Sequence, residues 1–359
     1  MSQQIGIRGM GMAVPPQVRT NDWWPEEFRR RFEEKSRGDV TTPEVFTDRA
    51  KTPAQRIQFQ QMLETYHDPF RGSRQRRIAE AGVKPSQLQI AAARQALERA
   101  GIDAVQLDVV LESSMPSDVP NPSNSGALIH GLGAKRAHGV SFDAGCSSFI
   151  SGLALAEAMI RAGQARYVLL AHVGMLSRIC DWNDPLSVNN GDGAGAVVVG
   201  PMDEGQGLLA HVSVTKGDLY DGMLVGPRGE EFWTEGKSPI VMQSRNLQAG
   251  RAIVLGTADF AKETIEIALR RAGVEKEQVT RFYSHQPSVF FNASSRLGAG
   301  LVNAQTTDTF ARYASMHAAN IPINLCEAQQ AGQLQRGDLC VFYACGTGLN
   351  LAAAVYRWQ

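Results

Sequence analysis

One cysteine stands where a thiol could act as a nucleophile. Cys146 lies in the stretch SFDAGCSSFISGLALAEAMIRAG, residues 141–163, between a predicted strand end and a long apolar helix. Free cysteine is often a small buried hydrophobic residue, which would make Cys146 part of the core. A thiol at a helix N-terminus can instead have its thiolate favoured, because the helix end carries partial positive charge. The position leaves packing and nucleophilic chemistry both open.

A histidine and a glycine-rich turn follow two other predicted strands. His285 comes after RFYS, and the turn at residues 345–348 reads CGTG. Ligands gather at strand ends in layered α/β proteins, so these features could converge with Cys146. A Cys/His pair suits acyl transfer, with backbone amides holding the oxyanion. A lone histidine at a strand end is also often a structural hydrogen-bonding residue, so spacing alone does not decide.

The elements that must position these residues alternate between strands and helices. Short apolar runs predict strands, and 3.6-residue periodicity predicts helices. Strands are predicted over 5–14, 105–114, 165–174, 194–200 and 279–286 and twice within 339–358, and helices over 87–102 and 125–133 and within 141–163 and 250–274. This alternation predicts an α/β fold with sheets covered by helices. We expect two similar halves, residues 1–205 and 206–359.

Residues 22–72 interrupt this alternation in the first half. The segment is charged and aromatic, and we expect mostly helical excursions there. Charge runs are usually solvent faces, which favours a solvated or dimer-packing insertion. Trp23 and Trp24 need burial, which would suit a lid over a substrate tunnel. Both interpretations stay open.

Composition excludes several classes of function. Lysine plus arginine equals aspartate plus glutamate at 36 each, which argues against a nucleic-acid surface over the whole protein. No apolar run reaches the length of a membrane span, and the first residues do not resemble a signal peptide. Five dispersed cysteines without a CxxC pair favour a reduced, cytoplasmic protein.

Several motifs together resemble the β-ketoacyl-ACP synthase III group of the thiolase superfamily. They are FDAGCSSFISGLALAEAMIRAG, NNGDGAGAVVV, SHQPSVF, HAANIPINL and ACGTGLNLAAAVYRW. The similarity covers nearly the whole chain except residues 22–72 and parts of 203–249. It implies a thiolase-like five-layered αβαβα fold, a homodimer, and no metal or redox cofactor. It also implies acyl-CoA or an acyl carrier protein as partner, with a small-molecule acceptor.

The resemblance also implies roles for individual residues. Cys146 matches the nucleophile that is loaded with an acyl group, and His285 matches the catalytic histidine. The oxyanion hole would use the backbone of Cys146 and of the late glycine turn at Thr347 and Gly348. Arg74 and Ser288 are the expected contacts for coenzyme A or pantetheine. The acyl group would then pass to a second substrate in a Claisen condensation.

The third catalytic position departs from the family pattern. The family carries an asparagine seven residues before a proline, and counting back from Pro322 gives Ser315. A serine hydroxyl donates only one hydrogen bond. Loss of one oxyanion donor typically costs about 3–4 kcal/mol. Decarboxylative condensation would then require His317 or Asn320 to substitute, although both fit structural roles in a packed turn.

Two cations expected around the donor are also absent. Pro185 stands where an arginine is expected after CDxxD, and Phe290 replaces a basic residue shortly after HQ. Fewer cations weaken the grip on nucleotide phosphates, so CoA and carrier protein both remain possible donors. Three functions stay open. They are a ketosynthase, an acyltransferase that makes esters or amides through the same acyl-cysteine, and an inactive partner subunit.

Overall fold

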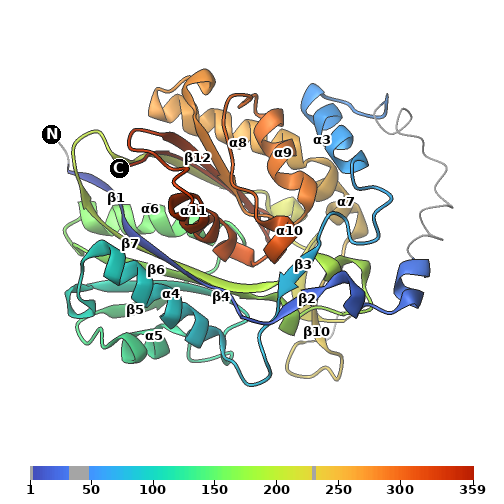
Figure 1. The fold of residues 1–359 in the computed structure, drawn as a ribbon, viewed down its shortest axis with the longest axis horizontal. Coiled ribbons are helices and arrows are strands. Elements are labelled where there is room, and N and C mark those ends of the chain that lie inside the picture. The colour runs from blue at the N-terminus through green and yellow to red at the C-terminus, as the bar shows by residue number, and fades with distance from the viewer. Residues whose placement is uncertain (1–2, 32–47, 229–231) are drawn as a thin grey trace.

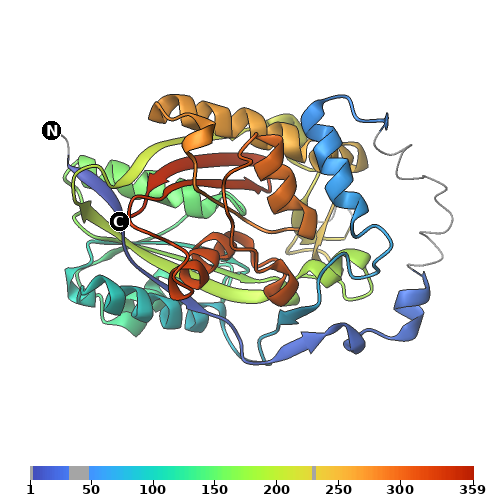
Figure 2. The same ribbon diagram turned by 45° about the horizontal axis from the view of Figure 1, so that its top comes forward.

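Five layers, alternating helix and sheet, make up the computed structural model (Figure 1). The structure describes residues 3–31, 48–228 and 232–359. Two sheets lie roughly parallel, with helices between them and on both outer faces (Figures 1 and 2). The predicted αβαβα architecture is confirmed.

The first sheet has five strands in the order β1-β7-β6-β4-β5. Their bounds are β1 Gln4–Ala13, β7 Asp192–Met202, β6 Val168–Met175, β4 Val109–Met115 and β5 His138–Ser141. Every residue of β6 is buried, because helices cover both faces of the sheet. This burial explains why β6 reads as a continuous apolar run rather than an alternating one.

The second sheet has four strands in the order β11-β12-β13-β8. Their bounds are β11 Arg281–Ser284, β12 Leu339–Gly346, β13 Asn350–Arg357 and β8 Gly207–Thr215. Two small ribbons accompany the sheets, β2 Val18–Thr20 with β3 Gln75–Arg77 and β9 Leu224–Pro227 with β10 Ile240–Gln243. The first sheet draws its strands from residues 4–202 and the second from 207–357. The division into two halves at residue 205 stays a prediction.

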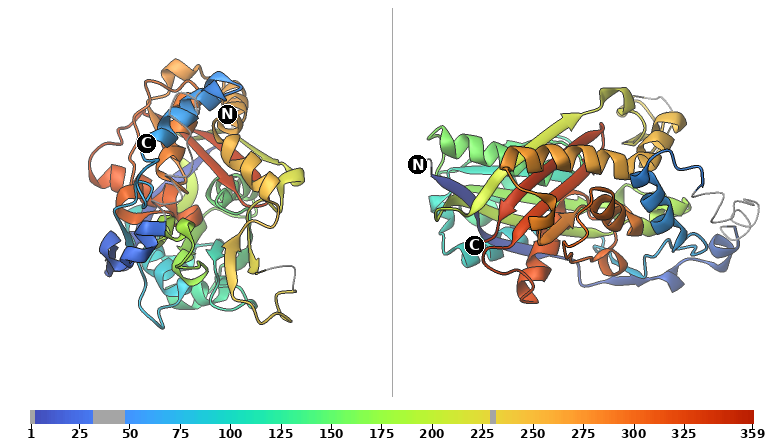
Figure 3. Two further views of the ribbon diagram at one scale, coloured as in Figure 1. Left: turned by 90° about the vertical axis from the view of Figure 1, so that its right-hand side faces the viewer. Right: turned by 90° about the horizontal axis from the view of Figure 1, so that it is seen from above.

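Helices fill the three remaining layers, as Figure 3 shows from two further sides. Their bounds are α3 Pro53–Leu63, α4 Pro85–Ala100, α5 Ser125–Leu132, α6 Ser148–Arg161, α7 Leu247–Leu255, α8 Thr257–Ala272, α9 Val289–Gly298, α10 Phe310–Tyr313 and α11 Asn320–Gln330. Helices α6 and α11 pack between the sheets. Helices α4 and α5 cover the first sheet, and α8 and α9 cover the second. Among the described residues, no helix is long and apolar enough to cross a membrane.

Strand alternation sorts side chains between these layers. Val168 and Leu170 face the central helices, whereas Leu169 and Ala171 face α4 and α5. Most predicted elements are confirmed within a few residues. The strand predicted over 105–114 is wrong at its start, because Ala104–Gln106 form a 3-10 turn capped by Asp103.

The insertion at residues 22–72 is helical at Pro53–Leu63, as expected, while residues 32–47 lie outside the described residues. Trp24 is only 2% exposed and packs with Phe28 and Phe70, whereas Trp23 is 49% exposed. These rings also pack with Val188 and Trp182 from the loop before β7, so the aromatic cluster joins the segment to the rest of the first half. The role of the segment as a lid or dimer contact stays a prediction.

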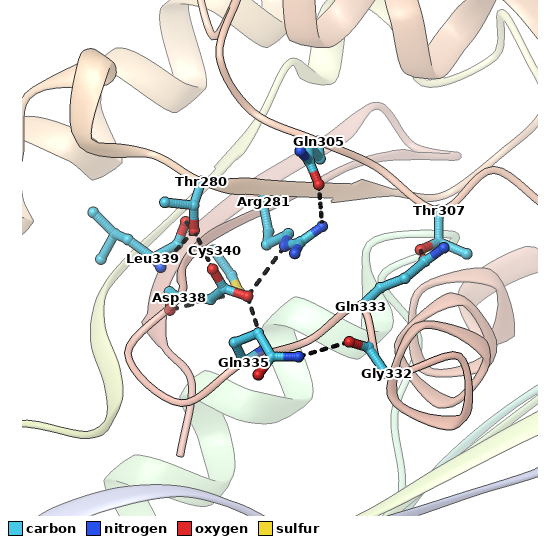
Figure 4. Close-up of polar contacts among 10 residues, drawn as sticks. All are labelled: Thr280, Arg281, Gln305, Thr307, Gly332, Gln333, Gln335, Asp338, Leu339 and Cys340. Atoms are coloured by element: carbon cyan, nitrogen blue, oxygen red, sulfur yellow. Dashed lines mark hydrogen bonds and ion pairs between the residues drawn. The ribbon is translucent and has the colours of Figure 1, made fainter.

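A polar cluster ties the beginnings of β11 and β12 together (Figure 4). Asp338 accepts hydrogen bonds from the Thr280 hydroxyl at 2.8 Å, Arg281 Nε at 3.1 Å and the Gln335 amide at 2.8 Å. Burial alone would raise the pKa of Asp338, but these three donors outweigh it and lower the pKa. The ionised carboxylate therefore stabilises the fold.

Replacing Asp338 with asparagine should lower the free energy of unfolding by about 1 kcal/mol at pH 7. A carboxyl with a lowered folded-state pKa stabilises above its unfolded pKa, about 3.9, and loses that stabilisation as the pH falls through the folded value. The wild-type advantage should therefore shrink at pH 3. Urea unfolding at both pH values tests this, with the exposed Asp203→Asn as control. An equal difference at both pH values would contradict it.

Candidate active site

Cys146 lies in the turn that connects β5 to α6. Gly145 before it has φ of +59°, a left-handed conformation that glycine adopts without strain. Hydroxyls close the turn, since Ser147 Oγ donates to the Ala144 carbonyl at 2.6 Å and Ser148 Oγ to that of Gly145 at 2.7 Å. The sequence AGCSS thus fixes the thiol at the start of a buried helix.

The late glycine turn touches the cysteine turn directly. A Cβ added to Gly346 would lie 2.7 Å from the Cys146 amide nitrogen, and one on Gly145 would lie 2.5 Å from the Thr347 nitrogen. Only residues without side chains permit this approach. Asn350 Nδ2 donates to the Thr347 carbonyl at 2.7 Å and holds the turn that contains Gly348. The structure thus brings together the amides predicted as an oxyanion hole, whose catalytic role stays a prediction.

The resting sulfur is a thiol rather than a thiolate. Burial and the nearby Asp143 carboxylate raise the pKa of Cys146 to about 12, against a smaller lowering by a backbone hydrogen bond. The helix N-terminus alone would favour the thiolate, but desolvation of the charge dominates here. Attack on a thioester therefore has to be coupled to loss of the thiol proton.

The alkylation rate of Cys146 should reflect this raised pKa. Below a pKa of about 12 the thiolate fraction rises tenfold for each pH unit. We expect the rate of iodoacetamide modification, followed on the Cys146 peptide by mass spectrometry, to climb steadily from pH 7 to pH 10. A plateau reached by pH 8 would mean that the sulfur is already ionised and that this electrostatic account is wrong.

His285 lies directly after β11 and is 1% exposed. Its Nδ1 accepts a hydrogen bond from the Cys345 amide at 3.3 Å, so the neutral ring carries its proton on Nε2. The ring packs edge-on against Phe291 with centroids 4.3 Å apart. Burial, with a smaller contribution from His317, lowers the pKa of His285 to about 3. His285 is therefore a neutral hydrogen-bond donor.

One strand end joins the two predicted catalytic residues. Cys345 holds the His285 ring through its amide, and the next residue, Gly346, abuts the Cys146 amide. Cys146 comes from the first half of the chain and His285 from the second. The end of β12 thus brings into one site two residues that lie 139 positions apart in the sequence.

Ser315 lies in the turn between α10 and α11. Its amide donates to the Asn189 carbonyl at 2.7 Å, and its carbonyl accepts from the Gly191 amide at 2.9 Å. These bonds fix the Ser315 backbone against the loop before β7. The catalytic role of Ser315 stays a prediction.

The two predicted coenzyme A or pantetheine contacts lie on neighbouring segments. Ser288 occupies the position before the first residue of α9, and a Cβ on Gly72 would lie 2.9 Å from Val289 Cβ. Arg74 is exposed two residues after Gly72, and its amide donates to the Ala311 carbonyl. The structure thus places Arg74 and Ser288 on touching segments, and their binding roles stay predictions.

A cavity of about 320 Å³ opens beside the cysteine turn. Its lining includes Gly145 and Thr347 together with a group of mostly apolar side chains from β4 and the β9 region. That group is Met115, Tyr220, Met223, Leu224 and Val225. Sequence reasoning missed these residues, because they come from separate segments, the end of β4 and the region around β9, and no motif links them.

Comparison with known proteins decides the family. The model described as 3-Oxoacyl-[acyl-carrier-protein (ACP)] synthase III matches residues 141–217, and that of its C-terminal part matches residues 269–358. The chain is 35% identical over 365 residues to a β-ketoacyl-[acyl-carrier-protein] synthase III of Roseiflexus sp. RS-1, covering 100% of this chain and 99% of the relative. This chain belongs to the 3-oxoacyl-[acyl-carrier-protein] synthase III family.

Further similar proteins agree in sequence and in structure. A relative from Bacillus pumilus is 30% identical across 84% of this chain and 93% of its own length. The crystal structure of the Aquifex aeolicus synthase III matches with a TM-score of 0.76 at 26% identity, covering 99% of this chain and 100% of that one. A priming β-ketosynthase from the R1128 polyketide pathway shares the fold, with a TM-score of 0.80 at 23% identity over 100% of this chain and 97% of its own. Family membership makes this chain an acyl-transferring enzyme.

Proposed function

We propose that this chain is a β-ketoacyl synthase in which Cys146 carries the acyl group and His285 holds the second substrate. One observation carries the proposal: the Cys345–Gly346 strand end holds the His285 ring and touches the Cys146 amide. A Cys/His pair beside clustered amides suits chemistry on thioester carbonyls.

The first step loads the enzyme. Cys146 sulfur attacks the carbonyl carbon of an acyl thioester, the bond from that carbon to the donor sulfur breaks, and the Cys146 proton ends on the released donor thiol. The amides of Cys146 and Thr347 would stabilise the oxyanion of the tetrahedral intermediate. The raised pKa of Cys146 fits such an exchange, because the departing sulfur can take up the proton.

The second step forms the carbon–carbon bond. A malonyl thioester loses its carboxylate as CO2, and the electron pair left behind forms an enolate. The enolate carbon attacks the acyl carbonyl and breaks its bond to Cys146 sulfur, which regains a proton from solvent. His285 Nε2–H can donate to the enolate oxygen, since Nδ1 is already engaged by Cys345.

The donor, the assembly and the compartment belong to the same proposal. The names of the relatives point to an acyl carrier protein as one substrate carrier. Arg74 and Ser288 are available to contact the pantetheine arm or coenzyme A, without the cations that Pro185 and Phe290 replace. We propose either carrier as acyl donor, a homodimer as the assembly, and the cytoplasm as the compartment.

Product analysis tests the ketosynthase proposal. The full-length enzyme is incubated with a panel of acyl-CoA donors and malonyl-carrier protein, and CO2 and β-ketoacyl-carrier protein are measured. We expect equal amounts of both products with at least one donor. Acylation of the enzyme without either product would overturn the ketosynthase assignment.

A second candidate is an acyltransferase that makes esters or amides. Ser315 favours it, because a serine at the usual asparagine position supplies less hydrogen bonding to an enolate. In that reaction an alcohol or amine attacks the acyl-Cys146 carbonyl, and its proton passes to the departing sulfur. Release of the acyl group by alcohols or amines, with none by malonyl-carrier protein, would favour this candidate.

A further inference from the structure

We propose that His317 supplies the second hydrogen-bond donor for the enolate, in place of the asparagine whose usual position Ser315 occupies. The inference rests on the proposed ketosynthase function and names a catalytic residue for its decarboxylation step. His317 lies two residues after Ser315, in a 3-10 turn that leads into α11.

The turn lays successive side chains over two neighbouring strands. Gly174 of β6 and Gly193 of β7 are paired across the first sheet. A Cβ on Gly193 would lie 2.5 Å from the Met316 sulfur, and one on Gly174 would lie 2.9 Å from His317 Cβ. Met316 therefore sits over β7, and His317 sits over β6 where a side chain at position 174 would otherwise fill the space.

That part of β6 faces the first turn of the nucleophile helix. His172 precedes Gly174 by two residues and so lies on the same face of β6. The His172 ring packs edge-on against Phe149 of α6, with centroids 5.8 Å apart, and against Phe142. The His317 side chain therefore starts between β6 and α6, the helix whose N-terminus follows Cys146.

The His317 ring is buried without a partner in the protein. Its side chain belongs to a residue that is 3% exposed, and neither Nδ1 nor Nε2 has a hydrogen-bond partner among the described residues. Buried polar groups are normally satisfied. Both ring nitrogens of His172 also lack partners, but His317 is the imidazole that interacts electrostatically with His285, so a substrate bound beside His285 is the partner that His317 lacks. The backbone supports this, since His317 has φ of +57°, a strained conformation concentrated at functional sites.

Charged and titratable neighbours place His317 among the site residues. Asp143 and His285 both interact electrostatically with it, and so does His172 from β6. Burial lowers the pKa of His317 to about 4, while Asp143 opposes the shift. A neutral imidazole has one N–H to donate, which is what an enolate oxygen requires beside the N–H of His285.

The proposed role of His317 affects decarboxylation of the malonyl thioester and not the acylation of Cys146. When the malonyl carboxylate departs as CO2, negative charge develops on the thioester oxygen, and two N–H donors share that charge instead of one. Attack of Cys146 on the donor thioester uses backbone amides and does not involve His317. Loss of the His317 donor should therefore slow decarboxylation and condensation but not acylation.

Two substitutions with side chains of similar length separate the effect of the N–H donor from the effect of the volume that the side chain fills. His317→Gln keeps an N–H donor, and His317→Met fills similar space without one. We expect malonyl-thioester decarboxylation by His317→Met to fall about 100-fold below that of His317→Gln, at equal melting temperature. Acylation of Cys146, followed by intact mass, should stay within about threefold for both variants.

A rescue variant and a packing control complete the test. Adding Ser315→Asn to His317→Met should restore most of the lost decarboxylation, because asparagine brings an N–H from the same turn. Cys340→Ala truncates another buried side chain, near the beginning of β12, and should change stability without changing the ratio of decarboxylation to acylation. Equal decarboxylation by His317→Met and His317→Gln would overturn the role of His317. Absence of acylation in the wild type would instead contradict the proposed function.

Discussion

Replacing Cys146 with alanine should abolish the acyl adduct and lower β-ketoacyl formation by at least about 10⁴-fold, because the variant has no atom to carry the acyl group. The substitution removes only a sulfur from a partly buried position, so the fold should persist. Intact-mass spectrometry after incubation with acyl donors measures the adduct directly. Circular dichroism confirms that the comparison is made on folded protein.

The matched control for this experiment is Cys180→Ala. Cys180 is also partly buried, and burial likewise raises its pKa to about 12, but its sulfur contacts the Ser177 carbonyl away from the glycine turn. We expect the control to acylate like the wild type. An acyl mass that persists in Cys146→Ala, or disappears in Cys180→Ala alone, would move the nucleophile elsewhere.

Replacing His285 with alanine should lower condensation by about 10²–10³-fold, which is the usual cost of removing one preorganised donor. Acylation of Cys146 should continue, because the ring donates to the second substrate in this account. The low pKa of His285, about 3, means that the ring stays neutral across the working range. The condensation rate of the wild type should therefore not fall with an apparent pKa near 6.5, and the pH profile of His285→Ala should have the same shape.

Separate measurements of Cys146 acylation and of condensation distinguish hydrogen-bond donation by His285 from a role of its ring in packing. His285→Gln retains an N–H donor and should recover part of the condensation rate that alanine loses. Both variants also lose the ring that packs on Phe291, so a general loss of structure would affect them alike. If acylation falls as far as condensation in both His285 variants, His285 acts in the acylation of Cys146, and its proposed restriction to condensation is wrong.

Much of the fold could be predicted because its longest strands and helices show clear hydrophobic patterns. The apolar run at β6 and the amphipathic pattern of α4 reflect burial on two faces and on one face, respectively. The start of β4 could not be predicted, because Val105 fits a strand by propensity. Its backbone instead joins a turn closed by Asp103, a local hydrogen bond that outweighs propensity.

The predicted site depended on residue type more than on geometry. Cys146 and His285 were candidates because each follows a strand, but their convergence depends on the close approach at Gly346, which one sequence does not reveal. His317 looked like a turn residue because its unpartnered ring nitrogens are visible only in three dimensions. The cavity residues Met115 and Tyr220 come from separate segments and share no motif.

A single-turnover chase shows whether the acyl group on Cys146 is the one that enters the β-ketoacyl product. Wild-type enzyme is loaded with an isotopically labelled acyl group, separated from free donor, and mixed with malonyl-carrier protein. We expect the labelled mass to leave Cys146 at the same rate at which labelled β-ketoacyl product and CO2 appear, in equal amounts. Labelled acyl-enzyme that persists while product forms, or that releases only free acid, would show that the Cys146 adduct is not the condensing intermediate.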